Sequence, residues 1–124
     1  MPTRREFLTT VSLLSVTTPL MARLAQREIR SALNGPIGLQ LWSLRAYLPK
    51  DLPGTLKTAR DMGFREVEGA GLWGHTAADL RKAMDAAGLR CQSAHMGYER
   101  LRDDLPGALA EARALGATWV VCPW

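Results

Sequence analysis

Five side chains able to hold or transform a ligand lie at or just beyond the ends of short apolar segments: Gln40, Trp42, Glu68, His95 and Trp124. Carboxylates and imidazoles are the side chains that enzymes most often use to transfer protons. One Glu and one His do not make a stable zinc or manganese centre, because such a centre needs three or four protein ligands. The five residues therefore predict a polar site rather than a metal centre.

The elements that must position these residues are short strands that alternate with helices from Ile37 onward. Apolar runs with strand-like alternation predict four strands, at residues 37–43, 64–69, 89–95 and 118–122. Apolar residues at helical spacing predict three helices, each followed by a glycine as is favoured after a helix, at residues 51–62, 76–87 and 103–115. One strand and one helix per repeat indicate parallel strands joined by right-handed crossovers.

This order of elements is typical of the α/β class, but by itself it does not separate a barrel from an open doubly wound sheet. Two observations favour the barrel. No strand is followed by a Gly-rich phosphate-binding loop. The polar residues gather at the C-terminal ends of the strands, where barrel enzymes place their sites. We therefore predict a partial (β/α)8 TIM barrel of about four parallel strands and three helices, preceded by an export leader.

Strict alternation along each strand predicts which side chains share a face. It groups the following pairs: Gln40 with Trp42, Glu66 with Glu68, Ser93 with His95, and Cys122 with Trp124. The intervening residues then face the helices, namely Leu39, Leu41, Val67 and Ala94. Because the carboxyl ends of parallel strands meet at one edge, we expect a carboxylate, an imidazole, an amide and two indoles around one rim.

Residues 1–25 have the outline of an export signal. Arg4 and Arg5 are followed by Phe7, Leu8 and a mildly apolar stretch without acidic residues, an arrangement that resembles a twin-arginine signal. The stretch is too short to span a bilayer as a stable helix, which needs about 20 apolar residues. We expect export to the periplasm, with transient membrane contact, or retention at the membrane if the leader is not cleaved. The alternative is an amphipathic N-terminal helix that packs on the domain.

The positive charge is concentrated in the same region. Residues 1–33 contain five arginines and two glutamates, so most of the net charge of +4 belongs to them. Residues 26–36 are predicted to be a linker, and the folded part that follows is nearly neutral. This balance argues against a nucleic-acid partner. The two cysteines, Cys91 and Cys122, form neither a metal motif nor a disulfide framework.

Five blocks of residues on the predicted strands and the first helix are similar to those of a known protein family: Leu39 to Arg45, Gly54 to Lys57, Glu66 to Ala70, Ser93 to Gly97, and Val120 to Trp124. Their residue types, order and spacing resemble the opening segment of sugar phosphate isomerase/epimerase proteins. These proteins belong to the xylose isomerase-like TIM barrel superfamily, and several carry a twin-arginine leader. The resemblance covers the segment 37–124.

The resemblance implies an enzyme with a divalent metal (Mn, Mg, Co or Zn) that interconverts aldoses and ketoses, or epimers, by moving a proton between neighbouring carbons. It implies that the metal ligands and the proton-transfer acids come mainly from later strands, which this chain does not contain, so the catalytic residues stay unknown. It also implies that Glu68 and His95 face the sugar together with Gln40, and that Trp42 and Trp124 form apolar walls. A Glu or His at a strand end also commonly serves as an ion-pair partner or structural donor, so both interpretations stay open.

Size limits what this chain can do alone. A complete barrel of this kind needs about 250 residues, so we expect residues 37–124 to be its N-terminal half, with open sheet edges and no activity by itself. The alternative function is a small non-catalytic α/β module that binds or assembles through those edges. An apurinic-site endonuclease of the same superfamily would need several zinc-binding histidines and a basic groove, whereas the chain has two histidines.

Overall fold

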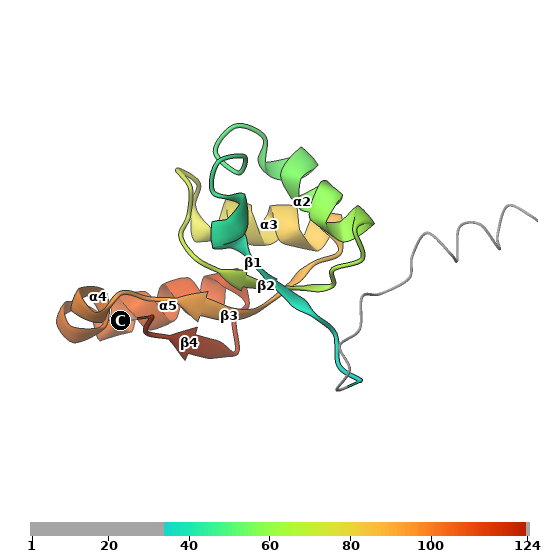
Figure 1. The fold of residues 1–124 in the computed structure, drawn as a ribbon. Coiled ribbons are helices and arrows are strands. Elements are labelled where there is room, and N and C mark those ends of the chain that lie inside the picture. Colours follow the sequence, from blue (N-terminus) through green and yellow to red (C-terminus); the bar gives the residue numbers. More distant parts are fainter. Residues whose placement is uncertain (1–33, 124) are drawn as a thin grey trace, which may run out of the picture.

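The computed structural model describes residues 34–123, which form a four-stranded parallel sheet with helices between the strands (Figure 1). In chain order the elements are β1 (Gly38–Gln40), the 3₁₀ helix η1 (Leu41–Leu44), α2 (Leu52–Asp61), β2 (Glu66–Gly69), α3 (Ala77–Ala87), β3 (Arg90–His95), α4 (Tyr98–Asp103), α5 (Leu105–Leu115) and β4 (Trp119–Val121). The strand order is β1-β2-β3-β4, and each neighbouring pair is parallel. The predicted α/β class and its four parallel strands are confirmed.

Two helices begin in the same way because the sequence Asp-Leu-Pro-Gly occurs twice. At the start of α2, the side chain of Asp51 accepts a hydrogen bond of 3.0 Å from the backbone N–H of Gly54. At the start of α5, Asp104 accepts a bond of the same length from Gly107. Proline lies in the first turn of each helix, where its missing N–H removes no intrahelical bond. The repeated segments therefore define both helix starts.

Glycine ends α3 and α5 where the sequence predicted. Gly88 and Gly116 follow these helices in the left-handed conformation, with φ of 72° and 81°. A residue without Cβ adopts this conformation at little cost, and it lets the next backbone groups bond back to the last helical turn. The chain can then turn directly into β3 and β4.

The core lies between one face of the sheet and the helices α2, α3 and α5, which pack side by side. The strands contribute small or branched side chains to it, among them Val67, Cys91 and Ala94. The helices contribute their inward stripes: Leu56, Leu80, Met84, Ala108, Ala112 and Leu115. The opposite face of the sheet carries the polar strand residues. Within the described part of the chain, no helix is long and apolar enough to cross a membrane.

The first strand ends earlier than predicted. Residues 37–43 were expected to form one strand, but β1 ends at Gln40 and the chain turns into η1. Leu41, Leu44 and Leu48 are spaced by three and four residues, so the same apolar residues also fit a helical turn. Leu41 and Leu48 are fully buried in that arrangement. The burial of Leu41 and Leu48 in the folded chain therefore favours the helical turn over a longer strand.

The segment after β3 contains a helix that was not predicted. Residues 98–103 form α4, and α5 begins at Leu105 rather than at 103. Because Asp104 is the N-cap of α5, the inward stripe begins at Ala108, and Leu105 is 48% exposed. The structure therefore has four α-helices among the described residues where the sequence predicted three.

Candidate functional site

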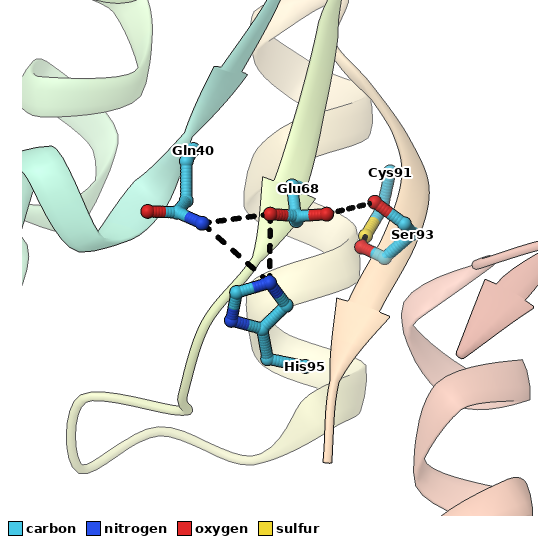
Figure 2. A network of polar contacts seen from close by, with 5 residues as sticks. All are labelled: Gln40, Glu68, Cys91, Ser93 and His95. Carbon is cyan, nitrogen blue, oxygen red and sulfur yellow. Dashed lines mark hydrogen bonds and ion pairs between the residues drawn. The ribbon is translucent and has the colours of Figure 1, made fainter. Parts of the chain in front are cut away.

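A polar network joins three neighbouring strands on the face of the sheet opposite the helices (Figure 2). Gln40 is the last residue of β1, Glu68 lies on β2, and Ser93 and His95 lie on β3. In register, Gln40 pairs with Glu68, and Glu68 pairs with Ser93. His95 follows two residues later, at the C-terminal end of its strand. The network therefore occupies the edge at which parallel α/β proteins place their sites.

The carboxylate of Glu68 is the centre of this network. Its Oε1 accepts a hydrogen bond of 2.8 Å from Nε2 of Gln40 and lies 2.8 Å from Nε2 of His95. Its Oε2 accepts a bond of 2.6 Å from Oγ of Ser93. The Nε2 atoms of Gln40 and His95 are 3.5 Å apart. The side chains of Glu68 and His95 are 27% and 19% exposed, so a ligand can reach them from solvent.

These contacts stabilise the ionised form of Glu68. Burial acts to raise the pKa of the carboxyl group, but hydrogen bonds from Ser93 and Gln40 and the nearby His95 outweigh burial. The pKa of Glu68 therefore lies below its ordinary value. At neutral pH the group is an anion that only accepts hydrogen bonds.

A β-bulge in β3 lets two successive side chains reach the same face. The register of β3 against β2 shifts by one residue at Gln92, which has no partner residue on β2. Gln92 donates to Oε1 of Glu66 at 3.0 Å, while Ser93 donates to Glu68 at 2.6 Å. Glu66 and Glu68 lie on one face of β2, so Gln92 and Ser93 must both point to that face, which strict alternation forbids. The bulge gives each carboxylate its own partner and keeps His95 directed toward Glu68.

Glu66 differs from Glu68 in its hydrogen-bond partners. Its Oε1 also accepts a hydrogen bond of 2.8 Å from Nη2 of Arg90, which makes an ion pair across the two strands. Glu66 begins β2, so this pair lies toward the N-terminal edge of the sheet. Of the two carboxylates, Glu68 is the one with a histidine partner at the C-terminal edge.

The structure brings together three of the five predicted site residues, Gln40, Glu68 and His95. The prediction that Trp42 continues the first strand beside Gln40 is wrong, because the chain leaves the sheet after Gln40. Trp124 lies outside the described residues.

Trp42 belongs instead to an aromatic cluster in the segments that follow β1 and β2. Its ring centroid lies 5.7 Å from that of Trp73, and the guanidinium of Arg45 lies 5.2 Å from it. Nη1 of Arg45 also donates to the backbone oxygen of Trp42 at 2.9 Å. Trp73 has a φ of 56°, which is unusual for a bulky residue. A ligand that stacks on Trp42 would contact an indole ring that already contacts Trp73 and Arg45.

Ser93 is the member of the network that the sequence places on the face of His95 but does not include among the five candidate site residues. Its place two residues before His95 puts it on the correct face, and that is the only local signal. Its contact with Glu68 depends on the register shift at Gln92, and a bulge of this kind has no residue signature in the strand.

The described residues do not fit a metal site by themselves. Within residues 34–123, no group of three or more His, Cys, Asp or Glu side chains lies close enough together to hold an ion. Glu68 and His95 supply two donors, and both carboxylate oxygens already accept hydrogen bonds. No chemical step is therefore assigned to a metal on these residues.

The order of groups also argues against a serine nucleophile. In nucleophilic triads the serine hydroxyl contacts the imidazole, which takes its proton. In this network the hydroxyl of Ser93 contacts the carboxylate of Glu68, and the imidazole lies on the other carboxylate oxygen. The arrangement is suited to holding a polar ligand and to exchanging a proton through His95.

Solved structures that share the fold of this chain include two from one organism. A sugar phosphate isomerase/epimerase from Parabacteroides distasonis ATCC 8503 is 24% identical with a TM-score of 0.59, and the match covers 71% of this chain and 42% of that chain. A second sugar phosphate isomerase/epimerase from the same organism is 25% identical with a TM-score of 0.58, and the match covers 71% and 38%. The chain thus spans about two fifths of the length of these structures.

No family model matches the sequence, and no curated protein matches it. At this level of identity the structural likeness establishes the fold. The described strands and helices form part of a TIM barrel, and not an open doubly wound sheet, so the predicted barrel is confirmed.

Proposed function

We propose that residues 37–124 are the N-terminal part of a sugar phosphate isomerase/epimerase-like barrel, and that the polar network binds the sugar. The observation that carries this proposal is the meeting of Gln40, Glu68 and His95, from three strands, in one hydrogen-bonded cluster at the C-terminal edge of the sheet. The five sequence blocks and the fold shared with the two P. distasonis structures support the same family.

In this proposal the described residues bind and orient the substrate. Amide, carboxylate and imidazole groups match the hydroxyls of a sugar, which both donate and accept hydrogen bonds. His95 lies against the carboxylate of Glu68 and can exchange a proton with a bound hydroxyl. Isomerisation or epimerisation by the longer proteins would also need a divalent metal (Mn, Mg, Co or Zn) and further acids. The resemblance assigns these to later strands, so we propose that this chain binds a sugar without turning it over.

The test is a titration of the 124-residue chain with a panel of ketoses and aldoses, with and without phosphate, followed by NMR. We expect shifts at the side-chain amide of Gln40 and the ring of His95. Glu68→Ala should abolish them, while Ser43→Ala, an exposed control in η1, should leave them unchanged. The absence of any sugar-dependent shift would contradict the proposal. Robust turnover by this chain with Mn²⁺, Mg²⁺ or Co²⁺ would contradict the assignment of catalysis to later strands.

We also propose that residues 1–25 direct export to the periplasm by the twin-arginine route. These residues lie outside the described part of the chain, so the proposal rests on Arg4, Arg5 and the mildly apolar stretch that follows them.

The second candidate is a module that self-associates through its open sheet edges, and exposed apolar groups at both edges favour it. On the edge strand β4, Trp119 is 68% exposed and Val120 is 36% exposed. Beside β1, a groove of about 550 Å³ is lined mainly by apolar groups, including Leu39, Leu44 and Met62. Unpaired strands with apolar side chains are ready to pair with another chain.

Light scattering after size-exclusion chromatography tests the second candidate. A discrete dimer that Trp119→Ser converts to monomer would support it, with Tyr98→Ser as a control at an exposed residue of α4, outside the edge strand. A monomer at all concentrations would exclude it and leave the sugar-binding proposal standing.

A further inference from the structure

The hydrogen bonds around Glu68 determine which atoms of its neighbours carry protons. The carboxylate is an anion with a lowered pKa, so it can only accept. Nε2 of Gln40, Nε2 of His95 and Oγ of Ser93 all lie within 2.8 Å of its two oxygens. Each of these three atoms must therefore present a hydrogen to the carboxylate.

This requirement leaves two atoms without a hydrogen. If Nε2 of Gln40 faces Glu68, the amide oxygen Oε1 points away from it. If Nε2 of a neutral His95 carries the proton, Nδ1 keeps a lone pair. Figure 2 shows the amide oxygen of Gln40 and the second ring nitrogen of His95 directed away from Glu68. Neither atom has a hydrogen-bond partner among residues 34–123.

We infer that Glu68 is a positioning residue that holds His95 in the Nε2–H tautomer, and that Nδ1 of His95 and Oε1 of Gln40 form an acceptor pair for neighbouring hydroxyl donors of a polyol. The inference rests on the proposed function and refines it, because Glu68 orients the ligand-facing groups instead of contacting the sugar itself. The two side chains are close enough to act on one ligand, since their Nε2 atoms are 3.5 Å apart.

Ser93 completes the arrangement from the other side of the carboxylate. Its hydroxyl holds Oε2 at 2.6 Å, so Oε1 is left to Gln40 and His95. A carboxylate fixed at both oxygens cannot rotate freely about its last side-chain bond. Ser93 therefore acts as a second positioning residue, and the bulge at Gln92 is what allows it to reach Glu68.

The tautomer can be measured directly by long-range ¹H–¹⁵N NMR on the full chain at about pH 9, where an imidazole is neutral. The chain has two histidines, and His75→Asn assigns the signals. We expect His95 to favour Nε2–H over Nδ1–H by at least about tenfold, as a charge-assisted hydrogen bond requires. In Glu68→Leu the ratio should return toward that of free histidine.

Three further variants separate positioning from general damage to the fold. Ser93→Ala should reduce the preference for Nε2–H, and Ser93→Thr, which keeps the hydroxyl, should restore it. Gln92→Ala, next to Ser93 on β3, removes the contact with Glu66 of β2 and should leave the ratio unchanged. A dominant Nδ1–H tautomer in the wild type, or an unchanged ratio in Glu68→Leu with a native circular dichroism spectrum, would overturn the inference.

A matched pair of ligands tests the acceptor pair. Methyl β-xylopyranoside supplies hydroxyl donors, and its fully O-methylated derivative supplies none. We expect only the first to shift Nδ1 of His95 and the side chain of Gln40. Equal shifts with both ligands would refute the acceptor pair. The predicted tautomer without any shift would leave the positioning role of Glu68 standing and would count against sugar binding, so the two failures are distinguishable.

Discussion

Replacing Glu68 by Gln would show how much the carboxylate contributes to the stability of the sheet. The substitution keeps the shape of the side chain but exchanges one acceptor oxygen for an NH₂ donor. Three donors face this group, from Gln40, Ser93 and His95, so at least one loses its acceptor. A hydrogen bond to a charged group contributes about 1.5–3 kcal/mol. Because Glu68 is 27% exposed and water replaces part of this contribution, we expect the free energy of unfolding to fall by about 1–2 kcal/mol near pH 7.

The effect of E68Q should depend on pH in a defined direction. Burial acts to raise the pKa of Glu68, but the bonds from Ser93 and Gln40 and the nearby His95 outweigh it, so the folded-state pKa is lowered. A lowered folded-state pKa contributes stability that is present above the unfolded-state value of about 4.3 and is lost as the pH falls through the folded-state value. The difference in stability between wild type and E68Q should therefore be largest near neutral pH and should shrink in acid.

Urea unfolding followed by circular dichroism, near pH 7 and near pH 3, measures both effects. Glu99→Gln removes an exposed carboxylate in the first turn of α4 and serves as the control, with an expected change under about 0.5 kcal/mol. Repeating the comparison in a His95→Asn background removes the charge of the imidazole from the result. Equal destabilisation at both pH values, or none near pH 7, would refute the role assigned to the carboxylate.

Three further predictions concern the helices α3 and α5 and the N-terminal leader. Asp104→Ala should cost about 1 kcal/mol in urea unfolding because it removes the cap of α5, whereas Asp103→Ala, at the exposed end of α4, should change little. Leu80→Ala should cost about 2–5 kcal/mol by the same assay, because Leu80 is fully buried between α3 and the sheet. Replacing Arg4 and Arg5 by Lys should stop export of a fused reporter, as measured by periplasmic fractionation, and unchanged export would contradict a twin-arginine leader.

The ends of α3 and α5 could be predicted because their signals are local, although α5 begins two residues later than predicted and α4 was not predicted. The acid and glycine of each Asp-Leu-Pro-Gly segment touch across a single turn, as Asp104 and Gly107 do at 3.0 Å. Gly88 and Gly116 adopt a conformation that their own lack of a side chain permits. Such signals need no information from distant parts of the chain.

The end of β1 could not be predicted from local pattern alone. Leu39 and Leu41 alternate as a strand requires, while Leu41, Leu44 and Leu48 also lie at helical spacing. The choice depends on the space beside β2, into which η1 packs so that Leu41 and Leu48 are buried. The consequence for the site is direct, because Trp42 leaves the strand face and joins Trp73.

The sequence could predict that polar side chains gather at one edge of the sheet, because the C-terminal ends of parallel strands lie at the same edge. Gln40, Glu68 and His95 met for that reason. The role of Ser93 was not predictable, because it depends on an inserted residue in β3 that changes the pairing with β2.

Glu66 and Glu68 show why register, and not residue type, decides the chemistry of this sheet. They have the same side chain on the same face of the same strand, and in the sequence only their positions along that strand distinguish them. Glu66 faces Arg90 in register before the bulge, and it accepts a hydrogen bond from Gln92 while the guanidinium of Arg90 neutralises its charge. The bulge places Ser93 opposite Glu68, and His95 lies against the same carboxylate at the C-terminal edge of the sheet. One extra residue in β3 therefore separates a carboxylate that pairs with Arg90 across the strands from one that is held between Ser93 and His95.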